Sequence, residues 1–413
     1  MIGVLQMSQS MLALEGIRVL EVARTPVASF CTMTLGDFGA EVIKIDPPPK
    51  PGRENLAVPN VGEENRPFNA HWHLNRNKKN VVIDLASKEG AGVFLRLART
   101  ADVIIEGFRP GVVKEMGIDY ESVSKVNPRI VYCSVTGYGQ DGPYRDFPGH
   151  DLNYIATGGV LGLIGSTQGP PVVPLNVIGD WAGGTMHALS GILIALLARD
   201  RTGRGQYVDV SMTDGVISFL NMFSPLYFLA GAVPKHGRSF MNGYFPYYAV
   251  YETGDGRYIA IGCHEPWFWD ALCHELGRDD LAGNHFKGGH LLGHGDDTDW
   301  DAIISELGRI FLTRSSDEWV SLLSPKDIPI SKVNDLGEVF SDPHVTHRKM
   351  VVEVNDPKAG KVRQIGIAIK LSDTPGSIRN LSPMLGEHTA EILRGAGFTD
   401  SELARLRGSR TII

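Results

Sequence analysis

The stretch that decides the fold is IRVLEVARTPVASFCTMTLGDFGAEVIKID, residues 17–46. The apolar run at 17–23 is typical of a buried strand, and residues 27–38 have the helical pattern, with small residues on one side. A second apolar, β-like run follows at 40–46. Strand, helix and strand in this order predict a βαβ unit with two parallel strands.

The same alternation continues through the next part of the chain. Apolar β-like runs lie at residues 80–85, 101–108 and 130–136, and a helical stretch, 88–100, separates the first two. Further on, the apolar stretch 181–199 is long enough for a buried helix. Repeated β and α segments predict an α/β fold with a mostly parallel sheet covered by helices.

The pattern changes at about residue 243. Two β-like runs flank the turn GDGR (254–257) as in a hairpin, and the helical stretch 266–277 follows. We therefore expect a large α/β domain from residues 1–225 and 342–413, and a smaller α+β domain with its linkers from residues 226–341.

Composition narrows the class of protein. The chain has 413 residues and a formal net charge of −7, which argues against nucleic acid as a partner. The longest apolar run, 188–198, is too short to span a membrane, and the N-terminus lacks the pattern of a secretory signal. No CxxC pair occurs among the four cysteines, which indicates free thiols and a cytoplasmic location. They are Cys31, Cys133, Cys263 and Cys273.

Two motifs that suggest ligands have simpler interpretations. GYGQDG (137–142) matches a dinucleotide-binding pattern, but Pro143 and a polar segment follow it in place of a helix. Histidines and aspartates cluster in residues 284–299, but this glycine-rich stretch favours a solvated surface loop over a metal site. A structural role is the better interpretation for His71 and His73, which have no evident third ligand. We expect no bound metal.

Two other stretches deserve a chemical interpretation: GHDLNYIATGGVLG (149–162) and PLNVIGDWAGG (174–184). His150 follows a Pro-Gly turn and precedes a helix-like run, so the local field can tune its pKa. The alternative is a hydrogen-bonded structural histidine. Asp180 immediately precedes the long apolar helix, so helix N-cap is the alternative to a chemical role. Asp151 is another candidate cap.

Around these residues the sequence resembles the family that contains the family III CoA-transferases and the α-methylacyl-CoA racemases. The resemblance covers nearly the whole chain and rests on eight stretches in order. They are LEGIRVLEVA, LGDFGAEVIKID, NKKNVVIDL, VIIEGFRPGV, NPRIVYCSVTGYGQDGP, GHDLNY, GDWAGG and TGRGQYVDVSM. It implies a Rossmann-like large domain built from both chain ends, a small domain, and an interlocked homodimer.

The resemblance also implies catalytic residues. The aspartate of the GDxxGG context is catalytic in both branches and matches Asp180. In transferases it attacks the thioester, forming an anhydride and then an aspartyl-CoA thioester. In racemases it is one of two proton-transfer groups, and the histidine of GHDxNY, here His150, is the other. The HEPWFW segment resembles a racemase motif whose glutamate matches Glu265 and supports the histidine. Backbone N–H groups after Asp180 are candidate donors to an enolate oxygen.

Coenzyme A is expected on the large domain as part of the substrate, with no separate cofactor. The positions that match family contacts are Leu85, Ala86, Gly107, Phe108 and Arg109. Two arginines that many members carry are Pro47 and Glu115 here. The resemblance therefore leaves Lys114, Arg76 or Lys79 to hold the phosphates.

His150 and Glu265 favour a racemase or epimerase that exchanges the α-proton of a 2-methylacyl-CoA or a related thioester. The alternative is a family III CoA-transferase, because the longer loop at 55–75 and MLGEHTAEIL (384–393) are more like that branch. A third class, a non-catalytic partner subunit, is disfavoured by the presence of Asp180.

Overall fold

The computed structural model describes residues 11–23, 25–49, 73–285, 299–356 and 360–413. The chain divides into two compact units. Unit one comprises residues 1–154, 176–216 and 343–413, and unit two comprises residues 155–175 and 217–342.

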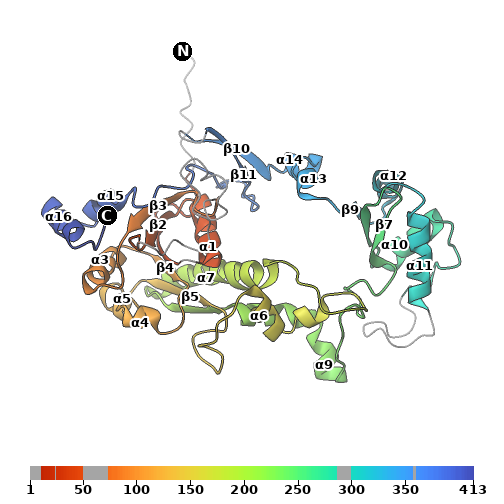
Figure 1. Ribbon diagram of the computed structural model, residues 1–413, viewed down its shortest axis with the longest axis horizontal. Helices are drawn as coiled ribbons and strands as arrows, with labels where there is room; N and C mark the ends of the chain where they lie inside the picture. Colours follow the sequence, from red (N-terminus) through yellow and green to blue (C-terminus); the bar gives the residue numbers. More distant parts are fainter. Residues whose placement is uncertain (1–10, 24, 50–72, 286–298, 357–359) are drawn as a thin grey trace, which may run out of the picture. The chain divides into compact units, whose positions relative to one another are not determined.

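Unit one is built on a six-stranded sheet in the order β3-β2-β1-β4-β5-β6, with every neighbouring pair parallel (Figure 1). The strands are β1 (Arg18–Val22), β2 (Glu41–Asp46), β3 (Lys78–Val82), β4 (Val103–Glu106), β5 (Val131–Thr136) and β6 (Tyr207–Ser211). The predicted α/β class with a parallel sheet is confirmed. The order reverses between β1 and β4, and in such sheets ligands bind outside the carboxyl ends of the strands at this point.

Helices cover both faces of this sheet because its strands are apolar on both sides. One face packs against α3 (Lys88–Ala98), α5 (Tyr120–Val126), α15 (Thr389–Gly395) and α16 (Asp400–Gly408). The other packs against α1 (Pro26–Asp37) and α7 (His187–Thr202). The C-terminal part of unit one also holds α14 (Pro343–His347) and the antiparallel pair β10 (Val351–Asp356) and β11 (Gly360–Ile365). Short helices α4 (Val112–Glu115), α6 (Asp151–Thr157) and α8 (Met212–Ser218) follow β4, β5 and β6.

A π-helix, η3 (Val177–Met186), leads directly into α7. Together they form one helical segment, Val177–Thr202, that is long and apolar enough to cross a membrane by length and composition. A core helix passes the same test, and 44% of its most apolar window is buried inside the protein. The apolar residues of α7 that are buried, such as Ile192, belong to the core against the sheet. We therefore interpret the segment as a core helix.

Unit two contains the three-stranded antiparallel sheet β7-β8-β9. Its strands are β7 (Tyr248–Glu252), β8 (Tyr258–Gly262) and β9 (Ile330–Lys332), and the predicted hairpin at GDGR is confirmed by the pairing of β7 with β8. Its helices include α9 (Ser224–Ala230), α10 (Pro266–Glu275), α11 (Trp300–Phe311), α12 (Ser316–Leu323) and α13 (Leu336–Val339). The core of this unit is rich in aromatic side chains.

The prediction of a solvated loop at residues 284–299 is wrong for His285. This residue is 8% exposed, and its ring lies 4.1 Å from that of Tyr247, centroid to centroid. The imidazole packs against the aromatic core of unit two, a contact that local glycine content does not predict. Asp299 is the N-cap of α11, where its side chain accepts the N–H of Ala302 at 3.0 Å. The other members of the cluster, His290, His294, Asp296 and Asp297, lie outside the described residues.

A buried charge cluster joins the first three strands to α1. Glu21 of β1 is fully buried and accepts hydrogen bonds from Lys44 of β2 at 2.9 Å and from Lys78 of β3 at 2.8 Å. The same carboxylate accepts hydrogen bonds from Ser29 and Thr32 of α1, both at 2.6 Å. Burial raises the pKa of Glu21, but the two lysines outweigh burial and hold this pKa well below its usual range. The carboxylate is therefore ionised in the folded protein.

Replacing Glu21 by glutamine is expected to lower the free energy of unfolding by about 3–5 kcal/mol, because it leaves two buried ammonium groups without their counter-charge. Urea denaturation at neutral pH measures the change. Glu41→Gln is the matched control, because Glu41 pairs with Arg18 and Lys79 at the surface and such pairs contribute about 1 kcal/mol or less.

The depressed pKa of Glu21 also sets a pH dependence. The stabilisation is present above the pKa of the unfolded state and is lost as the pH falls below it. The stability difference between wild type and Glu21→Gln should therefore shrink as the solution is acidified below about pH 4. Equal losses for Glu21→Gln and Glu41→Gln at neutral pH would contradict this account.

Candidate active site

The candidate residues of unit one gather at the carboxyl edge of the parallel sheet. The helix α1 begins there at its N-cap Thr25, and a Cβ on Gly107, which follows β4, would lie 2.8 Å from the Thr25 hydroxyl oxygen. The segment η3 packs on the start of α1, where the Thr185 hydroxyl donates to the Val27 carbonyl at 2.8 Å. This edge is where the strand order predicts a ligand crevice.

Asp180 lies in the first turn of η3 and is not the helix N-cap, so that alternative is wrong. Asn176 is at the N-cap position, and its side-chain amide donates to the Asp180 carboxylate at 3.1 Å. π-Helical segments are rare and frequently occur at functional sites. The carboxylate of Asp180 is thus half-buried, held by one amide, and available for chemistry.

Asp151 explains why the helix begins before Asp180. Its Oδ2 accepts the backbone N–H groups of Gly179 at 2.7 Å and of Asp180 at 2.8 Å, which are donors that a helix start leaves unpaired. Asp151 is 5% exposed, and its Oδ1 is buried without a hydrogen-bond partner among the described residues. The sequence identified Asp151 as a cap, but the helix that it caps starts 26 residues later.

His150 is at the start of α6, as predicted. Its backbone N–H donates to the side chain of Asn153 at 3.0 Å, and its carbonyl accepts the N–H groups of Asn153 and Tyr154. These three hydrogen bonds involve only the backbone of His150, and the residue is exposed. The turn before it is held by Tyr154, whose hydroxyl donates to the Gly149 carbonyl.

The two candidate acid–base groups are close enough for their charges to interact. Burial raises the pKa of Asp180 above its ordinary value, and the negative charge of Asp151 adds to that effect. The Asn176 hydrogen bond and a positive charge on His150 act in the opposite direction. A carboxyl group with a raised pKa is more readily protonated at neutral pH, as a proton donor requires.

Glu265 lies in unit two, at the N-cap position of α10, and its side chain makes no capping hydrogen bond there. It is half-buried. Its support of His150 stays a prediction.

The positions expected to contact coenzyme A follow β3 and β4 at the same sheet edge. Leu85 is buried, Ala86 and Arg109 are exposed, and Gly107 and Phe108 are half-buried. Lys114, on α4, is exposed. The exposed and half-buried groups among them lie where a ligand of the crevice can reach them, whereas the buried Leu85 side chain belongs to the core. Contact of coenzyme A with these positions stays a prediction.

Arg76 and Lys79 cannot substitute for the missing phosphate-binding arginines. Arg76 is 3% exposed and forms a two-pronged ion pair with Asp37, at 3.0 and 2.6 Å. Lys79 is near the start of β3, at the amino edge of the sheet, where it pairs with Glu41 and Glu391. Both expectations are wrong, because Arg76 is buried in its ion pair and Lys79 lies at the opposite edge of the sheet from Gly107 and Arg109.

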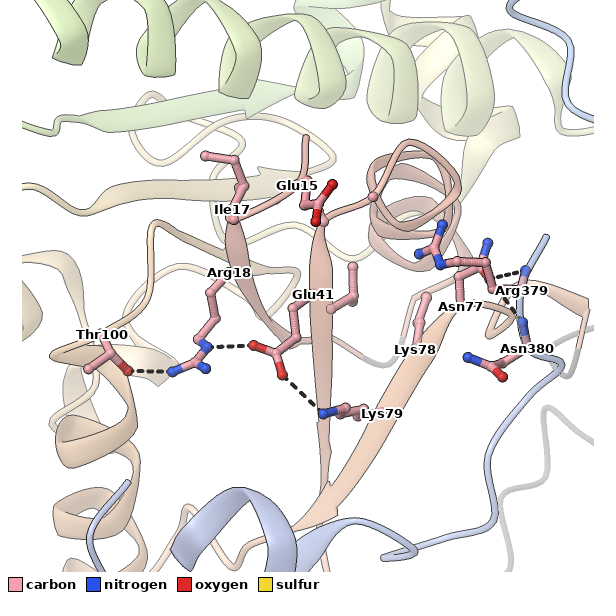
Figure 2. A pocket seen from close by; sticks show the side chains of 14 residues that line it. Glu15, Ile17, Arg18, Glu41, Asn77, Lys78, Lys79, Thr100, Arg379 and Asn380 are labelled. Carbon is pink, nitrogen blue, oxygen red and sulfur yellow. Dashed lines mark hydrogen bonds and ion pairs between the residues drawn. The ribbon is translucent and has the colours of Figure 1, made fainter. Parts of the chain in front are cut away.

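A cavity of about 530 Å³ lies at this amino edge and not beside the candidate catalytic residues (Figure 2). Its wall includes Arg18, Lys79 and Glu41, and the dashed lines of Figure 2 show that these charges pair with one another. Lys79 also pairs with Glu391, so both cations of this group are held by carboxylates. We assign no chemistry to it.

The described residues contain no group of three or more histidine, cysteine, aspartate or glutamate side chains able to hold a metal. His73 contacts the side chain of Gln364 at 2.9 Å, in line with a structural role, and His71 lies outside the described residues. The loop at 137–142 is not followed by a helix before α6, so it lacks the arrangement that binds a dinucleotide pyrophosphate.

The strand order defines an α/β protein with a candidate active site at the carboxyl edge of its sheet, and comparison with known proteins gives its family. The family model "CoA-transferase family III" matches residues 14–389. The chain belongs to this family, which confirms the resemblance.

Relatives include enzymes of both branches. The chain is 33% identical to the succinyl-CoA–L-malate CoA-transferase beta subunit of Chloroflexus aurantiacus, over 97% of this chain and 98% of that one. It is 31% identical to the human α-methylacyl-CoA racemase, again over 97% and 98%. A CAIB/BAIF family protein from Brucella suis superposes with a TM-score of 0.77 at 27% identity, covering 94% of this chain and 100% of that one. The chain is thus a member of an enzyme family with racemases and CoA-transferases.

Gly179→Ala tests the Asp151 contact, because a Cβ at this position would lie 2.8 Å from Asp151 Oδ2. We expect the two amide hydrogen bonds to break and hydrogen exchange in residues 177–186 to accelerate by about tenfold or more, since each bond to a charged group contributes about 1.5–3 kcal/mol. Mass spectrometry measures the exchange. Gly92→Ala in α3 is the control, because its added Cβ meets open space. Unchanged exchange in Gly179→Ala would contradict the contact.

Proposed function

We propose that the protein is an acyl-CoA racemase or epimerase that removes and returns the α-proton of a 2-methylacyl-CoA type of thioester. The observation that carries the proposal is the pair His150 and Asp180, two proton-transfer groups of one unit whose charges interact. The likeness to the human racemase supports it. Coenzyme A enters with the substrate, and no separate cofactor is needed.

In this mechanism one group removes the α-proton and the other returns a proton to the opposite face of the enolate. A neutral imidazole at His150 accepts the proton in one direction, while the carboxyl of Asp180 donates. The raised pKa of Asp180 favours the acid form that this direction requires. The reverse direction uses the same groups in the opposite protonation states. The N–H groups of Gly179 and Asp180 are taken by Asp151, so an enolate oxygen needs other donors.

The second candidate is CoA transfer from an acyl-CoA to a carboxylic acid. Asp180 attacks the thioester carbonyl, CoA leaves as the thiolate, and the resulting anhydride is opened by that thiolate to give an aspartyl-CoA thioester and a free acid. The incoming carboxylate then takes over the CoA through a second anhydride. Two observations favour CoA transfer: the half-buried Asp180 carboxylate has a single amide partner, and CoA-transferases are among the relatives. A non-catalytic role as partner subunit remains a third candidate.

Incubation with a 2-methylacyl-CoA in deuterated water separates the candidates. We expect α-deuterium incorporation that falls by at least about 100-fold in His150→Ala and in Asp180→Asn, since general acid–base groups contribute about 10²–10⁴-fold. Mass spectrometry of the recovered thioester measures it. Asp146→Asn is the control, because Asp146 is an exposed residue of the preceding loop.

Treatment of the acyl-CoA-loaded enzyme with hydroxylamine tests the transferase mechanism, because this nucleophile converts an aspartyl thioester into a hydroxamate. We expect no modification at Asp180. An adduct at Asp180, without deuterium incorporation and with full activity of His150→Ala, would establish the transferase in place of the racemase. Absence of both reactions would favour the partner-subunit role.

We also propose that the protein works as a homodimer in the cytoplasm. Apolar side chains are exposed on α7, where Ile194 and Leu197 are each 65% exposed, and on α9, where Phe228 and Leu229 are 77% and 87% exposed. Surfaces of this kind are typical of protein interfaces. All four cysteines are buried and unpaired, which suits a reducing compartment.

Sedimentation velocity is expected to give a species of twice the chain mass at micromolar concentration. Leu197→Glu should shift it toward the monomer, because the substitution buries a charge in an apolar interface. Glu121→Lys on α5 is a control that changes a surface charge elsewhere. A wild-type monomer would contradict the proposal.

A further inference from the structure

Glu106 is a buried carboxylic acid that the proposed chemistry does not use. It is the last residue of β4, in the centre of the parallel sheet, and is 1% exposed. Its Oε2 accepts the backbone N–H of Phe108 at 2.7 Å. The carboxylate therefore closes the turn Gly107–Arg109, where the chain leaves the sheet at the point of order reversal.

A chain of hydroxyl groups links Glu106 to the neighbouring strands. Ser134 of β5 pairs with Glu106 across the sheet, and its hydroxyl lies beside the carboxylate and helps to lower the pKa of Glu106. The hydroxyl of Tyr207 on β6 donates to Ser134 Oγ at 2.9 Å. Hydroxyl groups both donate and accept, so this chain can reverse its direction and satisfy Glu106 in its ionised or neutral form.

The charged neighbour of Glu106 is another carboxylate. Burial raises the pKa of Glu106 to about 7, and Asp209 of β6 adds to the increase, while the hydrogen bonds from Ser134 and Phe108 oppose it. The other titratable neighbours are Tyr132 and Cys133 of β5 and Tyr207 of β6. Burial raises the pKa of each, so all three stay neutral near pH 7. Among Glu106, Tyr132, Cys133 and Tyr207, Glu106 is therefore the residue whose charge changes near pH 7.

We propose that Glu106 is a positioning residue for acyl-CoA: it holds the turn Gly107–Arg109 through the Phe108 N–H, and its ionisation sets how firmly the coenzyme site is formed. The inference rests on the proposed function, which places coenzyme A on this turn.

The physical reason is the strength of the hydrogen bond. A hydrogen bond from an N–H to an ionised carboxylate is roughly twice as strong as one to a neutral acceptor. The ionised form therefore keeps the turn in one conformation, and a preformed site binds its ligand more tightly because less ordering is needed on binding. Protonation of Glu106 loosens the turn and weakens binding of the coenzyme.

Isothermal titration with free coenzyme A on the full-length protein, at several pH values between about 6 and 8.5, tests this inference. We expect the wild-type Kd to weaken by about fivefold from the alkaline to the acid end, beyond any change that titration of the ligand causes. Glu106→Gln imitates the neutral acid, since its amide oxygen accepts from Phe108 and its NH₂ donates to Ser134. Its Kd should equal the wild-type value at the acid end and lack the extra pH dependence.

Glu391→Gln, an exposed change on α15, is the control and should follow the wild-type profile. Ser134→Ala is a second test that keeps the glutamate: loss of a hydrogen bond to the ionised form should move the midpoint of the Kd profile to higher pH. Parallel profiles for wild type and Glu106→Gln, or an unmoved midpoint in Ser134→Ala, would overturn this inference alone. Absence of coenzyme A binding at every pH would overturn the proposed function along with it.

Discussion

The buried carboxylate of Glu21 is the interaction on which the rest of unit one depends. Two lysines from neighbouring strands and two hydroxyl groups from α1 converge on it, so one side chain fixes the spacing of three strands and the position of the helix above them. Charges buried in this way are tolerated only when they are paired and hydrogen-bonded. Because α1 is fixed, its N-cap residue, Thr25, lies against Gly107, and the crevice at the order reversal has defined walls.

The site contains neighbouring carboxyl groups with different duties. One oxygen of Asp151 accepts two backbone N–H groups, so Asp151 acts as a structural anion. The Asp180 carboxylate accepts a single hydrogen bond, from a side-chain amide. The negative charge of the first raises the pKa of the second. The same contacts that start the helix thus also bias the protonation of its candidate catalytic residue. Environment, and not residue type, distinguishes the two aspartates.

The fold was predictable from sequence because the central strands β1, β4 and β5 are buried on both faces, so each is an apolar run bounded by turns. The hairpin of unit two was predictable from its four-residue turn. The N-cap assignment of Asp180 failed because the residue that starts the helix is Asp151, 29 positions earlier. Arg76 was misjudged for the same reason, since Asp37 is 39 positions away. A local sequence pattern predicts local structure. The roles of Asp180 and Arg76 are set by contacts with Asp151 and Asp37, which form only when the chain has folded.

The π-helical segment η3 has a consequence for how the site is aligned. The helical run that contains Asp180 is pinned at both ends, by Asp151 at its first turn and by the ion pair of Arg199 with Asp102 of the loop before β4 at 2.9 Å. An α-helix advances by a fixed rotation of about 100° per residue, so two pinned ends leave no freedom to choose the phase of the residues between them. The wider turns of the π-helix η3 absorb this mismatch in phase, because they change the rotation per residue over the first part of the run. The sheet can therefore keep its packing against α7 while the turn that carries Asp180 has a different rotational phase.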